Sequence, residues 1–350
     1  MNRHILEFCG DNTAYSPRKK TDKLFPLPRG SARWEGVIDA VNRRISRWDM
    51  FNPSLWKTFV DQFRNLVDGG NNLWRCEFWG KMMRGACMTY QYTCDEELYA
   101  VLEESVRDML TAGDERGRIS TYSVETQLDG WDIWGRKYVL LGFQHFMEIS
   151  KDEALNGEIV TAMKRHTDAF IEDLHASGKP IYLCSRHWLG INSSSFLEPT
   201  VRLYNITGEK KYLDFAREIV EGGGAEGFDL FNEPLTNEKG PASYPVQKAY
   251  EMMSCFEGLL EYGRTTGEEK WIRSAMNLGK HVLQTELTVI GCAGCTHELF
   301  DGSKVAQFNE ELTGNIMQET CVSVTLMKFL LQLMSVSGDA DFADAIESAF

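Results

Sequence analysis

Thr207-Gly208-Glu209-Lys210-Lys211-Tyr212 is the stretch that decides the fold, because the chain repeats it. Each copy follows a long apolar segment and precedes an amphipathic one. The glycine suits the left-handed conformation that ends a helix, and the acidic residue after it suits the start of the next helix. The pattern therefore predicts a series of helical hairpins. The other copies lie at residues 93–98, 266–271 and 337–342, with a weaker one at 150–155.

The two helices of each hairpin differ in their expected burial. One kind carries a single apolar stripe at helical spacing, as in Tyr212, Phe215, Ala216, Ile219 and Val220. The other kind is apolar nearly all round, as in residues 138–143 and 321–331. Alternation of the two kinds predicts two concentric layers of helices, and hence an all-α fold, an (α/α)6 toroid or barrel of helical hairpins.

An α-solenoid that binds proteins is the alternative architecture. Its repeats, at ~34–47 residues, are usually shorter and more uniform than the hairpins of this chain, so the toroid is favoured. We expect a single toroid domain over residues 31–350. Residues 1–30, which contain Pro17, Pro26 and Pro28, are expected to form a loosely ordered arm.

Composition limits the classes of partner. The 350 residues include 51 acidic and 37 basic ones, and the net charge of −14 argues against binding to nucleic acid or to an anionic membrane. No signal peptide is recognisable at the N-terminus, and no stretch approaches the length of a membrane span. Nine cysteines, scattered through helical sequence, indicate reduced thiols and predict a cytoplasmic protein.

Chemically reactive side chains gather in the C-terminal third. His297-Glu298-Leu299-Phe300 lies in a long loop, and Glu319-Thr320-Cys321 opens an apolar helix. A carboxylate and a thiol two residues apart can converge only at a helix mouth, where the N-terminus also favours a thiolate. Two acids and a soft metal ligand in this arrangement predict an active site.

Several motifs resemble the bacterial β-L-arabinofuranosidase-like glycoside hydrolases of family 127. They are residues 74–81, 117–122 and 131–138 together with Glu319-Thr320-Cys321, and the resemblance runs from about Trp34 to the last residue. It implies an (α/α)6 barrel and a glycosidase that releases terminal sugars from oligosaccharides or glycoconjugates. It also implies that Glu298 is the general acid/base and that Glu319 and Cys321 are zinc ligands.

The remaining zinc ligands of that family form a pair of adjacent cysteines further downstream, and this sequence contains no such pair. Cys292 and Cys295, at metal-binding spacing, are alternative ligands, and His297 is a further one. We expect the last hairpin to be cut short at Phe350. An apolar surface left uncovered on the helix after Met317 would then favour self-association as a homo-oligomer.

Departures from the family suggest a changed sugar pocket. Trp131, Ser193 and Lys248 stand where the family has histidines, and the cations of Lys248 and Arg136 suit an acidic sugar. The residues predicted to contact carbohydrate are Trp79, Tyr122, Asp132, Arg136, Asn192, Lys248 and His297. Two alternatives remain: a metal-independent uronide hydrolase or lyase-like toroid enzyme that uses Asp132 and Glu298, and an inactive carbohydrate-binding fragment.

Overall fold

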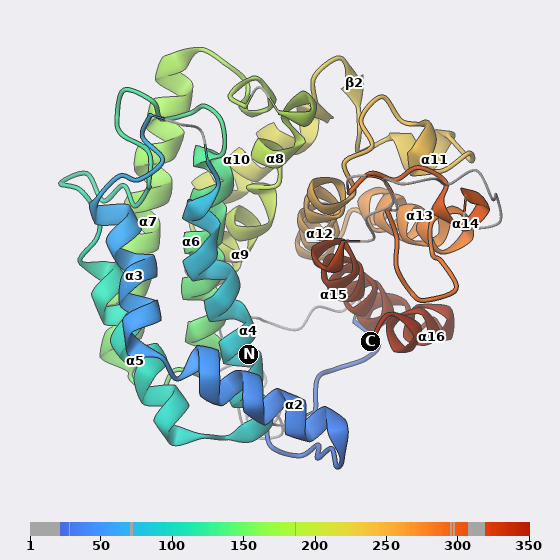
Figure 1. Ribbon diagram of the computed structural model, residues 1–350. Coiled ribbons are helices and arrows are strands. Elements are labelled where there is room, and N and C mark those ends of the chain that lie inside the picture. The colour runs from blue at the N-terminus through green and yellow to red at the C-terminus, as the bar shows by residue number, and fades with distance from the viewer. Residues whose placement is uncertain are drawn as a thin grey trace. The chain divides into compact units, whose positions relative to one another are not determined.

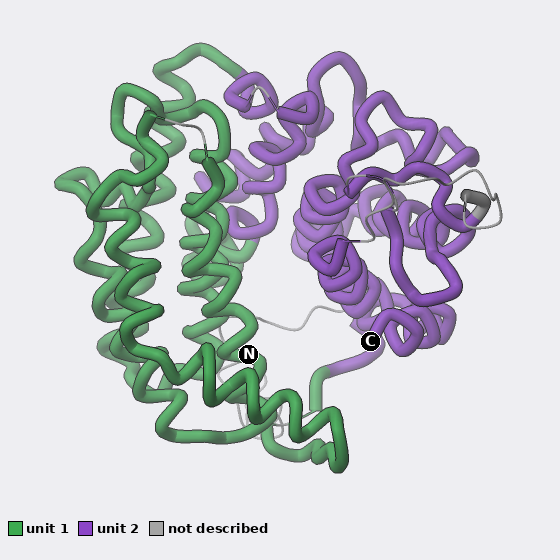
Figure 2. The backbone as a smooth tube through the Cα atoms, in the orientation of Figure 1, with its two compact units in different colours: residues 1–18, 26–179, 202–210 green, residues 19–25, 180–201, 211–350 purple. Residues whose placement is uncertain are grey.

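The computed structural model describes residues 22–27, 29–70, 73–185, 187–294, 296, 298–306 and 319–350. Their contacts divide the chain into two compact units, shown in different colours in Figure 2. Unit 1 contains Pro26–Lys179 and Arg202–Lys210, and unit 2 contains Pro180–Val201 and Lys211–Phe350, with short N-terminal segments assigned to each. The single domain over residues 31–350 stays a prediction. Most of the predicted arm, residues 1–21, lies outside the described residues.

Unit 1 is built from long helices that run alongside one another (Figure 1). A π-helical turn (Ser46–Met50) and a 3-10 turn (Arg75–Glu77) connect some of them. Within this unit α4 packs extensively against α6, and α5 packs against both α3 and α7. The helices are α2 (Val37–Ile45), α3 (Pro53–Arg64), α4 (Phe78–Thr93), α5 (Glu96–Leu110), α6 (Asp132–Ile149) and α7 (Glu153–Ser177).

Helix α9 (Leu197–Thr207) passes from unit 2 into unit 1, and α10 (Lys210–Glu221) leads back into unit 2. Unit 2 is centred on α12 (Ala249–Thr266), which packs against α8 (Ile191–Ser194), α13 (Glu269–Thr285) and α15 (Thr320–Ser337). The short strands β1 (Gly224–Ala225) and β2 (Phe228–Asp229) form an antiparallel pair. The remaining helices are α11 (Glu233–Thr236), α14 (Ser303–Ala306) and α16 (Ala340–Ala349), with 3-10 turns at Ile181–Leu183, Trp188–Gly190 and Pro241–Ser243.

The predicted hairpins are confirmed, and residues at several of their turns act as expected, although Glu268 at the start of α13 makes no side-chain capping bond. Gly267 ends α12 and Gly338 ends α15, both in the left-handed region. Asp95, Asp152 and Asp339 each cap the next helix, because their carboxylates accept hydrogen bonds from its first backbone N–H groups. The repeated motif thus ends one helix and begins the next.

Burial of the helices follows the predicted division, with one correction. Helix α6 is buried all round and α10 buries only its predicted stripe. Helix α15 was expected to be apolar and buried nearly all round, but Val324 is 46% exposed and Leu331 is 50% exposed. The opposite side of α15 packs on α12, α13 and α16, so the apolar residues on the uncovered side face outward.

Length and composition alone make α15 a candidate membrane span, with a mean hydropathy of 1.4 over its 18 residues. The prediction that no stretch approaches such a length is therefore wrong. The core helix of a globular protein passes the same test, and α15 has 44% of this window buried within the chain. Among the described residues it is the sole helix that passes.

Candidate active site

Two stretches of unit 2 that are distant in the sequence supply the candidate site. Glu319 is the N-cap residue of α15, and Cys321 lies in the first turn of that helix. Glu298 lies in the loop between α13 and α14, with its backbone in the left-handed region at φ 63°. A non-glycine residue held there costs on the order of 1–3 kcal/mol, and such strain is concentrated at active sites and ligand clamps.

The predicted convergence of the two acids and the thiol is present. One ligand atom from each of Glu298, Glu319 and Cys321 lies within 4.8 Å of the others. The Cys321 thiol donates a hydrogen bond to Oε1 of Glu298 at 3.7 Å. All three residues are half-buried, so the cluster is sheltered but remains accessible from solvent.

Backbone pairing holds the Glu298 loop against the start of α12. The Ala249 N–H donates to the carbonyl of Glu298 at 2.9 Å, and the Phe300 N–H donates to the carbonyl of Gln247 at 2.8 Å. Lys248 and Leu299 are therefore antiparallel partners. This short ladder fixes where the Glu298 carboxylate is presented.

Among the described residues, Lys248 is the cation that pairs with the Glu298 carboxylate. Its ammonium forms an ion pair with Oε2 of Glu298 and lies 5.0 Å from the centre of the Trp188 ring. Lys248 is 8% exposed, so the pair is largely shielded from water. The hypothesis that Lys248 binds an acidic sugar is not supported, because an internal carboxylate already neutralises this cation.

Trp188 is a further residue of the site region. Its ring remains 40% exposed beside Lys248. Trp188, Leu189 and Gly190 are three consecutive residues with positive φ, at 53°, 52° and 80°. A glycine is visible in the sequence at the third position, but the strain at the first two has no sequence signal.

The donor set fits zinc. Thiolate and carboxylate ligands are typical of zinc, and three protein ligands with an open position are typical of catalytic zinc sites. Oε2 of Glu319 is a buried atom without a hydrogen-bond partner among the described residues. A buried carboxylate oxygen that lacks a donor is destabilising unless a cation or water compensates it. Glu319 and Cys321 would hold such an ion, with the Glu298 carboxylate beside it.

The other predicted ligands do not join this cluster. Cys292 lies in the described part of the loop, where its backbone exchanges hydrogen bonds with Thr288, and it is not grouped with the three. Cys295 and His297 lie outside the described residues, so their predicted roles as metal ligand and as sugar contact stay predictions.

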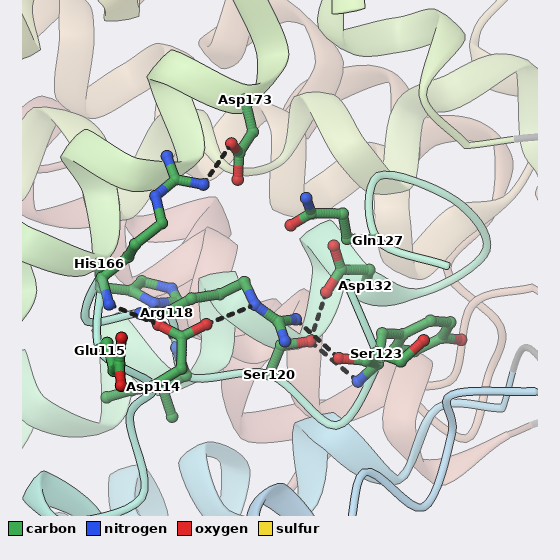
Figure 3. A network of polar contacts seen from close by, with 12 residues as sticks. Asp114, Glu115, Arg118, Ser120, Ser123, Gln127, Asp132, His166 and Asp173 are labelled. Carbon is green, nitrogen blue, oxygen red and sulfur yellow. Dashed lines mark hydrogen bonds and ion pairs between the residues drawn. The ribbon is translucent and has the colours of Figure 1, made fainter. Parts of the chain in front are cut away.

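Asp132 and Arg136, predicted as sugar contacts, form a fully buried ion pair in unit 1. Asp132 accepts a hydrogen bond from the Ser120 hydroxyl at 2.5 Å (Figure 3). It accepts another from the Leu128 N–H at 2.8 Å. Arg136 also donates to the side chain of Gln127 at 2.9 Å. Burial opposes ionisation of Asp132, but Arg136 and these donors outweigh it and hold the pKa of Asp132 below its ordinary value. The pair anchors the 117–130 loop to α6 and is not open to a sugar.

Trp79, Tyr122 and Asn192 are also completely buried, which corrects their prediction as carbohydrate contacts. The Trp79 ring packs against Phe143 and donates its N–H to Ser105, while the Tyr122 hydroxyl donates to the carbonyl of Leu73. Asn192 lies in α8, within the core of unit 2. Side chains that no solvent reaches cannot stack on or bind a sugar without local opening.

His166 gives unit 1 a specific pH dependence. Its Nδ1 accepts a hydrogen bond from the Ile119 N–H, and burial, assisted by Arg136, lowers the pKa of His166 to about 3. Below its ordinary pKa the unfolded chain binds a proton that the folded chain does not, so stability falls as the pH falls through this range. We expect a loss of about 2 kcal/mol in unfolding free energy between pH 7 and pH 5.

The replacement His166→Gln should remove this contribution, and urea titrations of the parent chain and the variant at several pH values measure the difference. His145, whose pKa burial also lowers, contributes equally in both proteins. Asp132 does not confuse the comparison, because a carboxylate whose pKa is lowered destabilises the fold only at more acidic pH. An unchanged slope between pH 7 and pH 5 in the variant would show that His166 is not the source.

Comparison with known proteins identifies the family to which this chain belongs. Residues 35–350 match the model of the β-L-arabinofuranosidase GH127 catalytic domain. A curated relative, the non-reducing end β-L-arabinofuranosidase of Bifidobacterium longum subsp. longum, is 23% identical over 172 residues, which cover 42% of this chain and 25% of that protein. The chain thus spans only a quarter of the length of this relative.

Solved structures show the same fold at low identity. A GH127 β-arabinofuranosidase matches with a TM-score of 0.62 and 16% identity over 93% of this chain and 53% of its own. A GH127 β-L-arabinofuranosidase from Geobacillus stearothermophilus T6 matches with a TM-score of 0.63 and 14% identity over 91% and 55%. The predicted all-α toroid class is confirmed by this likeness. Since the family model covers most of the sequence, the chain belongs to the GH127 β-L-arabinofuranosidase catalytic-domain family.

Proposed function

We propose that this chain carries the catalytic site of a glycoside hydrolase that releases terminal β-L-arabinofuranose or a closely related sugar. The single observation that carries the proposal is the convergence of Glu298, Glu319 and Cys321 within 4.8 Å. The family model and the activity named for the Bifidobacterium relative support the reaction class. The predictions of a cytoplasmic location and of homo-oligomers stay predictions.

In this proposal Glu298 transfers the proton at the glycosidic oxygen. General acid/base catalysis requires a carboxyl group that is fixed within reach of that oxygen. The ladder to the start of α12 and the ion pair with Lys248 fix the side chain from two directions. The exposed face of Trp188 beside this pair is well placed to contact the sugar or the leaving group.

Glu319 and Cys321, with Glu298 beside them, would hold a zinc ion in the same site. When bound, zinc supplies a Lewis-acid charge and keeps a coordinating thiol deprotonated. The protein's part is to present the ligands. Glu319 does so as the N-cap of α15, and Cys321 does so from the first turn, where backbone N–H groups favour a thiolate.

The metal-independent uronide hydrolase is less well supported than this proposal. It needs Asp132 as a reacting acid, but Asp132 is buried and paired with Arg136. The other alternative, an inactive carbohydrate-binding chain, would bind sugar without turnover. Assays with aryl glycosides therefore distinguish it from the proposed glycosidase.

Elemental analysis of the purified chain, together with assays on a nitrophenyl β-L-arabinofuranoside, tests the proposal. We expect bound zinc and turnover in the parent chain, and loss of both in Cys321→Ala. The matched control is Cys292→Ala, because Cys292 lies in the same unit but outside the cluster. Zinc that remains bound after Cys321→Ala, or turnover that survives it, would contradict the proposal.

A further inference from the structure

Glu286 is a fully buried carboxylate that accepts hydrogen bonds from the Thr285 hydroxyl and from the backbone of the loop that leads into α14. It follows the last residue of α13 and accepts backbone N–H groups from three consecutive residues, at 3.1 Å from Asp301, 3.0 Å from Gly302 and 3.2 Å from Ser303. Three adjacent N–H groups around one carboxylate form a nest that fixes the backbone between them. Glu286 therefore holds the segment that leads into α14.

Asp301 connects the segment held by Glu286 to Thr296, earlier in the same loop. Its Oδ2 accepts the Thr296 N–H at 2.9 Å, and its Oδ1 accepts the Ser303 hydroxyl at 2.6 Å. The Leu299 N–H in turn donates to the carbonyl of Thr296 at 2.9 Å. These bonds form a turn that has Glu298 within it.

The loop from residue 298 to residue 303 is thus anchored to two different helices. The ladder from Gln247 to Ala249 ties it to the start of α12, and Glu286 ties it to the end of α13. The left-handed backbone of Glu298 belongs to the first anchor, because its carbonyl accepts the Ala249 N–H, and it lies three residues before the segment that Glu286 holds. An unfavourable backbone conformation persists only where the surroundings determine it, so removing one anchor should release it.

We propose that Glu286 is a positioning residue, which holds the 296–303 loop so that Glu298 reaches Glu319 and Cys321. This rests on the proposed function for its catalytic consequence, but the structural part stands on the bonds above. Glu286 does not touch the cluster itself. Its effect passes through Asp301 and the backbone of the loop.

The test compares Glu286→Ala with Glu286→Gln and with Ser274→Ala in the full chain. Glutamine keeps an acceptor for the N–H groups and removes the charge, whose burial raises the pKa of Glu286 above its ordinary value. Ser274 is a buried residue of the same helix that donates to the carbonyl of Phe231, away from the loop. It reports the effect of losing a buried hydrogen bond in α13 alone.

Hydrogen–deuterium exchange gives the first readout. We expect the amides of residues 298–303 to exchange much faster in Glu286→Ala, to be largely protected in Glu286→Gln and to be unchanged in Ser274→Ala. Unchanged exchange of these amides in Glu286→Ala would overturn the inference, whether or not the chain turns over any glycoside.

Kinetics and Co²⁺ binding give the second readout. A misplaced acid can cost about 10²-fold in rate, so kcat of Glu286→Ala should fall by about that factor while KM changes little. The visible absorption of Co²⁺ added as a probe should change in the same variant, because the Glu298 carboxylate no longer lies beside Glu319 and Cys321. A loss as large in Ser274→Ala would overturn the inference. A parent chain that neither binds Co²⁺ nor turns over glycosides would sink the proposed function, and exchange would still decide the role of Glu286.

Discussion

Replacing Glu298 with glutamine should lower turnover of an aryl β-L-arabinofuranoside by about 10²–10⁴-fold, the contribution typical of a general acid/base. Glutamine has nearly the same shape but cannot transfer the proton. It also removes the negative charge that forms the ion pair with Lys248 and that strengthens the hydrogen bond from the Cys321 thiol. Steady-state kinetics of the purified variant, at the pH optimum of the parent chain, measure the effect.

The control for this substitution is Glu226→Gln, which changes an exposed glutamate of the same unit. Its kinetics should match those of the parent chain. Because the Glu298 side chain is only 22% exposed, circular dichroism should confirm that the variant is folded. Turnover within a few-fold of the parent chain would exclude Glu298 as the acid/base.

The second large effect is expected on stability. Asp132→Ala should reduce the free energy of unfolding by about 3–5 kcal/mol, because it leaves the buried guanidinium of Arg136 without its carboxylate. Nη1 of Arg136 already has no hydrogen-bond partner among the described residues, so the cation has little to compensate the loss. Chemical denaturation at pH 7 measures this change.

A double replacement separates charge from packing. Asp132→Leu together with Arg136→Met removes both charges and keeps apolar volume, and such exchanges are often close to neutral. We expect the double variant to recover most of the stability lost in Asp132→Ala. If Asp132→Ala instead left stability unchanged and raised KM selectively, the predicted sugar contact would be restored.

The hairpins could be predicted from the sequence because their determinants are local. A glycine that ends a helix and an aspartate that caps the next act within a few residues of each other. Cys94 shows the boundary of such reasoning, since it takes the left-handed position without being glycine, at φ 53°. The flanking Asp95 preserved the signal there.

The candidate site was only partly readable. The gathering of Glu298, Glu319 and Cys321 was expected from acids and a thiol at a helix mouth, the family resemblance suggested their roles, and the structure brings the three together. The partner of Lys248 is fifty residues away, so no local pattern indicated that this cation would meet Glu298. Glu286 had no signal either, since its role depends on a loop that folds back onto α13.

The predicted aromatic and polar contacts were wrong for a common reason. Trp79, Tyr122 and Asp132 lie beside glycines and turns that resemble a binding loop, but all are in the core. Burial depends on which helices pack together, and that packing cannot be read from local sequence motifs. Trp188 differs from these buried residues, because it lies in a strained turn beside Lys248 and stays partly exposed.

The ladder between residues 247–249 and 298–300 has a consequence for how this chain can vary. It joins the two ends of the segment that contains α12 and α13, so the segment begins and ends at the same point. Insertions or deletions at the distant Gly267 turn would lengthen or shorten the α12–α13 segment without moving the Glu298 carboxylate. Relatives should therefore tolerate length changes there far better than within the few residues on either side of Glu298.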